Sequence, residues 1–322
     1  MRSDTEKNKP KQQNNNCKGV KKMGWRILQI TKPCKLSVKN RQLVYECLES
    51  DTLKLPLEDI SVIILENKQI CFNNTLFSEL AEYNIVLFSC DSSHLPSGAF
   101  FPYHNHSRYS EIAWQQVESS EPLKKRIWQE IVKAKIKNQA AVLKCLEKDG
   151  YKKLIEISKH VQSGDAKNAE AYAANLYWKY LWSNFNRNDE SDIRNSALNY
   201  GYAIIRGAMA RAVVGAGMLP CFGIHHANKL NSFNLVDDLM EPFRPFIDNK
   251  VAMMNLDNIK ELNTDIKQQL VAVLTQNSII NGEEISLLYG CEIEAASVAK
   301  CIKNKAVGDL KIPVLNNLPL FV

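Results

Sequence analysis

The chain begins with strand-type patterns. Between residues 24 and 103, short runs rich in β-branched and aromatic residues recur, separated by clusters of Asn, Asp, Gly, Ser or Pro. These runs predict strands at 25–30, 34–38, 43–47, 60–65, 69–72 and 85–90. Apolar residues at helical spacing over 74–82 predict one helix before the last of these strands.

From residue 110 to 304 the apolar positions repeat every three to four residues, as in amphipathic helices. In 123–146 one face is apolar and the other is basic, with Lys133, Lys135 and Lys137 among its members. That basic face would suit a DNA backbone, and it would equally suit plain solvent. Further helices are predicted at 151–161, 166–184, 192–214, 231–249, 257–276 and 293–304.

These patterns predict an α+β protein with a small, mainly β N-terminal domain followed by a larger all-α domain. Residues 1–22 are polar and basic and predict a disordered tail. The β domain is assigned to 23–103, a linker to 104–109 and the helical domain to 110–322. Within the last of these, the apolar stretch 311–322 is expected to add a strand or to dock on a partner.

Charge and cysteine usage narrow the setting of the protein. The formal net charge is +6, but seven basic and two acidic residues give the tail 1–22 a net charge of +5. The folded body therefore carries about +1, so overall charge is a weak argument for nucleic-acid binding. Nine scattered cysteines without a CxxC pair indicate a reducing, cytoplasmic setting and no zinc site. No signal peptide or membrane span is expected, because the most apolar region, 200–224, contains two arginines.

The densest group of ligand-type side chains lies between residues 223 and 245, among core-type residues. Its members are His225, His226, Asp237, Asp238, Glu241 and Arg244. If this segment is one helix, Glu241 shares a face with both aspartates, and a cation between the acids would relieve their repulsion. An acidic face in solvent fits the same spacing. Pro242 removes a backbone N–H, so a kink near Glu241 is expected.

A second candidate is Glu170, in the alanine- and aromatic-rich sequence NAEAYAANLYW at 168–178. A carboxylate on such a face needs a partner if it is buried. As a surface residue it would instead suit the first turn of a helix, because of the helix dipole. His225 and His226 are adjacent and point apart on any regular element, so at most one of them faces the site of Glu241.

Three stretches together carry a family resemblance. They are NAEAYAANLYW at 168–178, RNSALNYGYAII at 194–205, and the segment 223–245 with its FNLVDDLMEPFRP. In this combination the chain resembles the integrase subunit of the CRISPR adaptation machinery, which inserts new spacers during antiviral defence. The likeness covers essentially residues 23–304, and Glu at position 241 looks most like the type II form. The tail before Met23 departs from the family pattern.

The resemblance implies that Glu170, His226 and Glu241 are catalytic ligands of Mg²⁺ or Mn²⁺. It also implies that Asp238 is either a fourth ligand or a partner of a ligand, and that His225 is structural. In the family's reaction, a 3′-hydroxyl of the incoming DNA attacks a phosphodiester at the edge of a CRISPR repeat. Water in place of that hydroxyl would give endonuclease activity.

The resemblance also implies partners. They are double-stranded DNA (the prespacer and the CRISPR repeat), a second copy of the chain through the β domain, the small companion protein of the adaptation complex and, for a type II system, the effector nuclease. The candidate DNA contacts are Lys229, Arg194, Tyr200 and Arg244. Three functions compete: an integrase, a generic metal-dependent nuclease or phosphatase, and a DNA-binding scaffold. The products distinguish them, because only an integrase joins DNA.

Overall fold

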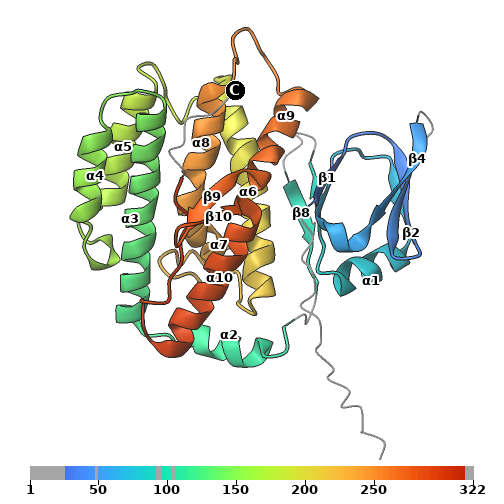
Figure 1. Ribbon diagram of the computed structural model, residues 1–322, viewed down its shortest axis with the longest axis horizontal. Helices are drawn as coiled ribbons and strands as arrows, with labels where there is room; N and C mark the ends of the chain where they lie inside the picture. The colour runs from blue at the N-terminus through green and yellow to red at the C-terminus, as the bar shows by residue number, and fades with distance from the viewer. Residues whose placement is uncertain (1–25, 48–49, 92–95, 103–105, 316–322) are drawn as a thin grey trace, which may run out of the picture.

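The computed structural model describes residues 26–47, 50–91, 96–102 and 106–315. Strands β1 to β8, with helix α1, gather at one end of the molecule, and the other helices, with β9 and β10, at the other (Figure 1). The predicted α+β class, with the β part first, is therefore confirmed. The predicted tail 1–22 lies outside the described residues, and the exact domain boundaries stay a prediction.

The N-terminal part consists of β-strands and one α-helix. Their bounds are β1 (Arg26–Ile30), β2 (Cys34–Lys39), β3 (Gln42–Cys47), β4 (Ser50–Pro56), β5 (Ile60–Leu65), β6 (Ile70–Phe72), α1 (Asn74–Glu82), β7 (Val86–Cys90) and β8 (Pro96–Phe100). One sheet has the order β1-β5-β7-β8, in which only β8 is antiparallel to its neighbour. The other has the order β4-β3-β2-β6. Strand β4 was not predicted, because its SDTLKLP sequence lacks a run of β-branched residues.

Strand β5 is buried along its whole length because it packs on both faces. Ile63 and Leu65 point into a core between the two sheets. Val62 and Ile64, which alternate with them, point into the core of the helical part. The sheet of β1 and β5 is thus the layer that joins the two halves of the molecule (Figure 1).

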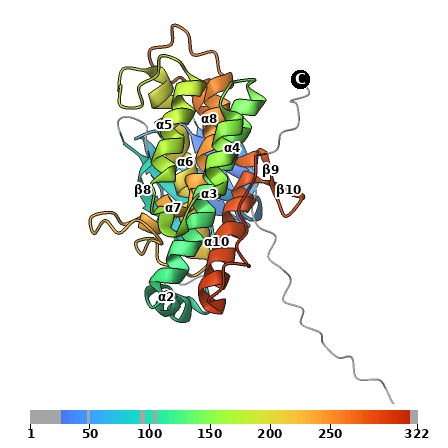
Figure 2. The same ribbon diagram turned by 90° about the vertical axis from the view of Figure 1, so that its left-hand side faces the viewer.

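The C-terminal part is mainly helical. Its elements are α2 (Tyr109–Val117), α3 (Glu121–Cys145), α4 (Tyr151–Lys159), η2 (Ser163–Asp165), α5 (Ala169–Leu181), α6 (Ile193–Gly215), α7 (Asn234–Leu239), η3 (Glu241–Phe243), α8 (Arg244–Met253), α9 (Thr264–Val271), η4 (Ala272–Thr275), β9 (Asn277–Ile280), β10 (Glu283–Ser286) and α10 (Leu287–Asn304). Helix α6 is buried over most of its length and packs against α8, α9 and α10. Figure 2 shows α3, α4, α5 and α8 running side by side.

The structure corrects two sequence expectations here. The helix predicted for 257–276 is shorter, because α9 begins at Thr264, where the Asn263 side chain accepts the N–H of Ile266. A β9–β10 hairpin follows that the helical pattern did not show. Val314 forms an isolated antiparallel bridge with Ile279, so the described part of the C-terminal stretch makes one strand-type contact without forming a strand, and its role stays a prediction.

The predicted helix 231–249 is in fact three pieces, α7, η3 and α8. The kink lies at Glu241–Phe243, as Pro242 predicts. There the carbonyl of Met240 accepts the N–H groups of both Phe243 and Arg244. This short 3₁₀ turn is what directs Glu241 away from the aspartates of α7.

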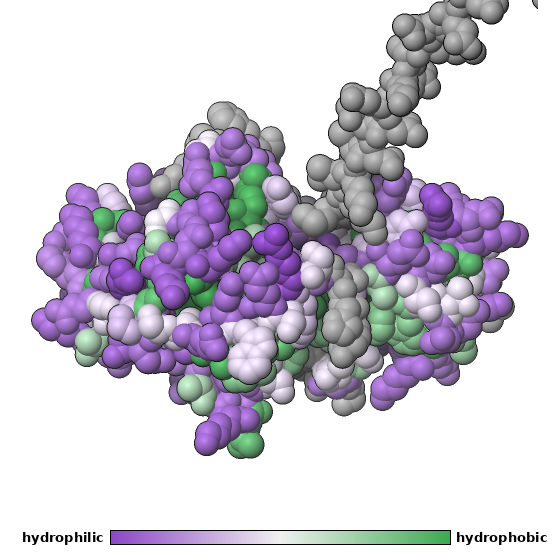
Figure 3. Space-filling view, turned by 90° about the horizontal axis from the view of Figure 1, so that it is seen from below, coloured by the Kyte–Doolittle hydropathy of each residue, from purple (hydrophilic) through white to green (hydrophobic). Residues whose placement is uncertain are grey.

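The outer surface is polar. Seen from below, apolar side chains appear only in small groups between hydrophilic ones (Figure 3). Within the described part of the chain, no helix combines the length and the hydropathy needed to cross a membrane.

The contact between sheet and helices requires a glycine on α6. A Cβ added at Gly207 would lie 2.6 Å from Cζ of Phe88 on β7, whereas one added at Gly215 would meet nothing closer than 3.8 Å. We expect Gly207→Ala to lower the free energy of unfolding by about 1–2 kcal/mol, because overpacking outweighs the gain in helix propensity. The matched Gly215→Ala should raise it by about 0.5–1 kcal/mol.

Urea denaturation of both variants and the wild type measures these changes. A Gly207→Ala protein as stable as the Gly215→Ala protein would contradict the close approach of Phe88 to α6.

Candidate active site

Three elements of the helical part bring two distant glutamates to one lysine. The Nζ atom of Lys135, on α3, lies 2.6 Å from Oε1 of Glu170 on α5 and 2.5 Å from Oε2 of Glu241 on η3. The two carboxylate oxygens are therefore no more than 5.1 Å apart, the sum of these distances. Lys135 was predicted to lie on a basic surface face of its helix. This prediction was wrong, because its side chain is only 11% exposed.

Glu241 is buried and ionised between two cations. Its Oε1 accepts a hydrogen bond of 2.8 Å from Nε of Arg244, while its Oε2 pairs with Lys135 without hydrogen-bond geometry. Burial alone would raise the pKa of Glu241, but the charges of Lys135 and Arg244 lower it to about 2. Burial likewise opposes the charge on Lys135, yet Glu241 and Glu170 raise the pKa of its ammonium. The cluster is therefore charged on both sides.

Glu170 is positioned by the aspartate that precedes its helix. The buried side chain of Asp165 accepts the backbone N–H of Ala169 at 2.8 Å and that of Glu170 at 3.0 Å. These bonds satisfy N–H groups at the start of α5 that have no partner within the helix. They fix the first turn of α5 and, with it, the direction in which Glu170 leaves the backbone.

The two histidines lie in a loop wrapped around Asp238. This fully buried carboxylate accepts the backbone N–H groups of Ile224, His225 and His226, and Nδ1 of His226 lies 2.5 Å from its Oδ1. The loop passes so close that a Cβ at Gly223 would lie 2.2 Å from the carbonyl oxygen of His226. Only glycine allows this wrapping.

The two histidine rings have different surroundings. His225 stacks on Trp128 of α3, with ring centres 4.4 Å apart and an angle of 1°. His226 meets the same ring edge-on, and its side chain remains 47% exposed. The hydrogen bond to Asp238 is the main cause that raises the pKa of His226, with smaller contributions from Glu241 and Glu170. The Nε2 atom of His226 is the ring nitrogen not bonded to Asp238.

The acids of 237–241 do not lie on one continuous helix, although Asp237 and Glu241 line the same groove. Helix α7 ends at Leu239, before Glu241, and each acid takes a different cation. Asp237 pairs with Arg206 at 2.6 Å, while Asp238 pairs with the histidine loop. Because both oxygens of Asp238 are already used, its surroundings favour the role of holding His226 over that of a fourth ligand.

The predicted DNA contacts differ in availability. Lys229 is exposed, whereas Arg194 is tied to Asp192 at 2.6 Å, and Arg244 is held by Glu241. Tyr200 cannot contact DNA in this structure. Its side chain is 1% exposed, and its hydroxyl donates to Glu66 at 2.7 Å. It belongs to the contact between sheet and helices.

A groove of about 420 Å³ lies beside Glu241 and was not predicted from the sequence. It is lined by Arg187, Asn199, Tyr202, Ala203, Arg206, His226, Asp237, Met240, Glu241 and Arg244. Its three arginines, Arg187, Arg206 and Arg244, suit the binding of phosphate groups. The i, i+3, i+7 spacing of Asn199, Tyr202 and Arg206 along α6 was the available signal.

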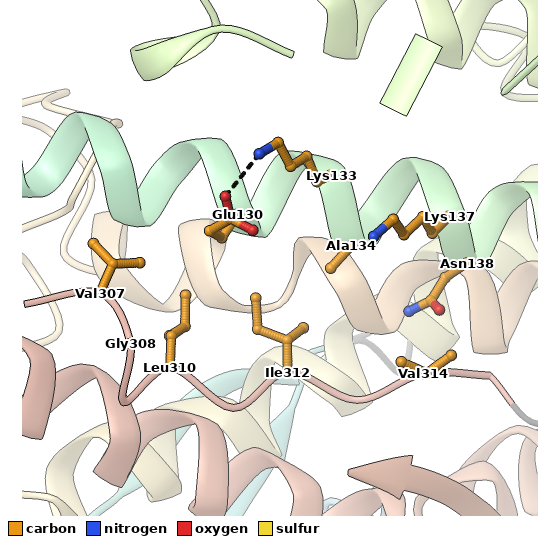
Figure 4. Close-up of a pocket in the computed structure, with 10 residues that line it drawn as sticks. All are labelled: Glu130, Lys133, Ala134, Lys137, Asn138, Val307, Gly308, Leu310, Ile312 and Val314. Atoms are coloured by element: carbon orange, nitrogen blue, oxygen red, sulfur yellow. Dashed lines mark hydrogen bonds and ion pairs between the residues drawn. The ribbon is translucent and has the colours of Figure 1, made fainter. Parts of the chain in front are cut away.

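Asn138, one turn after Lys135 on α3, links η3 to the C-terminal segment. Its amide nitrogen donates to the carbonyls of Pro242 at 2.8 Å and Pro313 at 3.0 Å. Its amide oxygen accepts the N–H of Leu315 at 3.1 Å. Figure 4 shows this side chain pointing from α3 toward the C-terminal segment, across a groove. The turn that carries Glu241 is thus fixed from behind.

A buried acid also lies behind Glu241. The hydroxyl of Tyr202 donates to Asp248, and Arg244 lies over the Tyr202 ring, 4.7 Å from its centre. Burial raises the pKa of Asp248 to about 7, although Tyr202 and Arg244 act in the opposite direction. This carboxyl is therefore mostly protonated below neutral pH in the folded protein.

Comparison with known proteins identifies the family of the chain. Residues 28–280 match the family described as CRISPR associated protein Cas1. The chain is 40% identical over 302 residues to the CRISPR-associated endonuclease Cas1 of Neisseria meningitidis serogroup C (strain 8013), covering 92% of this chain and 98% of that one. The chain belongs to the Cas1 family. The resemblance inferred from its motifs is therefore confirmed. By family, the chain is an endonuclease and integrase of CRISPR adaptation.

Other members and structures extend the match. The Cas1 1 endonuclease of Francisella tularensis subsp. novicida (strain U112) is 25% identical over 282 residues, covering 79% of this chain and 86% of that one. A casposase bound to its integration product has a similar fold, with a TM-score of 0.71 and 18% identity, over 87% of this chain and 91% of that one. A Cas1 protein from Thermotoga maritima has a TM-score of 0.67 and 17% identity, over 88% and 99%.

The cap of α5 gives a testable prediction. Asp165→Ala should lower the free energy of unfolding by about 1–2 kcal/mol and reduce DNA cleavage, because Glu170 loses its fixed direction. Asn263→Ala, which removes the cap of α9, should cause a similar loss of stability with cleavage retained. Thermal unfolding and nuclease assays measure both. Equal loss of cleavage in the two variants would contradict a specific role for Asp165.

Asp248 gives a pH prediction. Its usual pKa is 3.8, so between about pH 4 and 7 the unfolded chain loses this proton while the folded protein keeps it. Its contribution to stability therefore falls as the pH rises toward 7. The advantage of Asp248→Asn over wild type should grow by about 1.4 kcal/mol per pH unit between pH 5 and 7.

Urea denaturation at pH 5, 6 and 7 measures this advantage. The exposed Glu121→Gln on α3 is the control, and its difference from wild type should stay constant, because its partner Lys124 does not titrate between pH 5 and 7. A constant difference for Asp248→Asn as well would show that this carboxyl is ionised in the folded protein.

Proposed function

We propose that this Cas1 protein joins DNA by a metal-dependent transesterification at Glu170, His226 and Glu241. The observation that carries the proposal is that Glu170 and Glu241, which come from separate elements, both contact the ammonium of Lys135. Their contacting carboxylate oxygens are therefore no more than 5.1 Å apart, the sum of the two distances to that ammonium. Such a pair of carboxylates, one buried and one half-buried, with an exposed imidazole close enough to respond to their charge, is typical of a divalent-cation site.

The chemistry of the donors fits Mg²⁺ or Mn²⁺. Glu241 supplies a buried carboxylate oxygen that accepts no hydrogen bond, Glu170 supplies a second carboxylate, and His226 supplies Nε2. Asp238 holds the imidazole through Nδ1, as carboxylates commonly do behind metal-bound histidines. In their present positions, the described residues gather no three such side chains into a set that could hold an ion. Lys135 lies between the two glutamates instead.

When bound, the ion would polarise the phosphodiester and lower the pKa of an attacking hydroxyl. The residues of the chain do the rest. Arg187, Arg206 and Arg244 line the groove beside Glu241 and would hold the scissile phosphate and its neighbours. A new bond forms from the incoming 3′-oxygen to phosphorus as the bond to the 3′-oxygen of the target strand breaks. The proton of the attacker is released, and the leaving oxygen takes one up.

The partners follow from the same proposal. The substrates are the prespacer and the CRISPR repeat, both double-stranded DNA, in line with the casposase neighbour that is bound to its integration product. A companion protein and a second copy through the β domain complete the assembly. Support for the companion comes from a Cas6-RT-Cas1–Cas2 complex, one chain of which has a fold similar to that of this protein. A type II effector nuclease is the expected further partner.

An in vitro integration assay tests the function. It combines the protein, its companion, Mn²⁺, a short duplex with free 3′-hydroxyls and a plasmid that carries the repeat. We expect Glu170→Gln, His226→Ala and Glu241→Gln each to lower strand joining by about 100-fold or more, because each removes a proposed ligand. The exposed Glu156→Gln should join DNA as the wild type does.

The products separate the alternatives. DNA that is cut but never joined would indicate a generic nuclease. Unchanged strand joining in all three variants would contradict the proposed site. Removal of the metal with a chelator should abolish joining in the wild type, and Mn²⁺ should restore it.

A further inference from the structure

The position of Lys135 is set by the helix that carries it. Helix α3 is held at Trp128 by the histidine loop and at Asn138 by η3 and the C-terminal segment. Lys135 lies between these two contacts and is 9% exposed. Its backbone is thus fixed, and only the four-carbon side chain is free to change direction.

The two glutamates need a cation between them. Two carboxylates at this separation, one buried (Glu241) and one half-buried (Glu170), repel each other when no cation lies between them. The structure supplies one positive charge to both, the Lys135 ammonium, while Arg244 pairs only with Glu241. The same two carboxylates are the anionic ligands of the proposed metal centre, and the ammonium lies between them.

We propose that Lys135 is an internal counter-cation that holds Glu170 and Glu241 together while no metal is bound, and that a divalent ion binds the pair by displacing the ammonium. The inference rests on the proposed metal site. The ammonium contacts both carboxylates at similar distances, 2.6 Å to Glu170 and 2.5 Å to Glu241, so both contacts must break when the ion binds.

Lys135 thus differs from a surface lysine that only follows a DNA backbone. It sets the metal affinity of the site, because each binding event must break two ion pairs. It also keeps the site assembled beforehand, so that Glu170 and Glu241 are already close when the ion arrives.

Two measurements test the proposal without relying on activity. Calorimetry measures Mn²⁺ binding, and thermal unfolding is compared with and without Mn²⁺. Lys135→Met keeps most of the side-chain volume and removes the charge. We expect it to bind Mn²⁺ at least about tenfold more tightly than the wild type. It should unfold at a lower temperature without metal and gain more from Mn²⁺, because the ion replaces the lost charge. Lys133→Met, two residues away and paired with Glu130 at the surface, should match the wild type in metal binding.

Lys135→Arg separates charge from volume and keeps the site folded. A guanidinium can donate hydrogen bonds to both carboxylates at once, so we expect Mn²⁺ to bind several-fold more weakly to Lys135→Arg than to the wild type. If Lys135→Met does not fold without metal, its folding on addition of Mn²⁺ would support the proposal. If it does not fold with Mn²⁺ either, the Mn²⁺ affinity of Lys135→Arg tests the proposal.

Two results would overturn the inference. Unchanged or weaker Mn²⁺ binding in Lys135→Met, with a wild type that binds Mn²⁺, would show that the ammonium does not compete with the ion for the two carboxylates and would leave the proposed function intact. A wild type, Lys133→Met and Lys135→Met that all fail to bind Mn²⁺ would overturn the proposed metal site, and the inference with it.

Discussion

One buried ammonium group holds the proposed active site together. Lys135 pairs with carboxylates from two elements that are separated by more than seventy positions in the chain. Since the buried Glu241 requires an opposite charge and the half-buried Glu170 shares the same one, the approach of Glu170 to Glu241 depends on this contact. Helix α3 carries the lysine, and the same helix anchors the histidine loop through Trp128 and the turn of Glu241 through Asn138.

The remainder of the site is built outward from α3. Asp238 gathers the histidine loop, Asp165 directs the start of α5, and Pro242 turns Glu241 toward the lysine. None of these residues needs to touch DNA. Each fixes a side chain that would, and the arginine-lined groove lies beside Glu241 on the side where a phosphate backbone would enter.

Much of this was readable from the sequence. Most of the strands and helices, the helix at Asn74–Glu82 and the kink at Pro242 follow from local patterns, because they depend on neighbours along the chain, whereas β4, β8, β9 and β10 were not predicted. The motifs also named Glu170, His226 and Glu241, and identified the family. The sequence did not reveal that Lys135 is buried or that Tyr200 joins the sheet to the helices. A lysine on a polar helix face and a tyrosine on an amphipathic helix look alike whether they meet solvent or a distant part of the chain.

The central claim is that Glu170, His226 and Glu241 converge on one divalent ion. Anomalous diffraction from crystals of the protein soaked in Mn²⁺ tests it most directly. We expect a single strong peak about 2.2 Å from both carboxylates and from Nε2 of His226, with the Lys135 ammonium displaced from between the two glutamates. A peak bound elsewhere, or no peak while Lys135 still bridges the two glutamates, would contradict it.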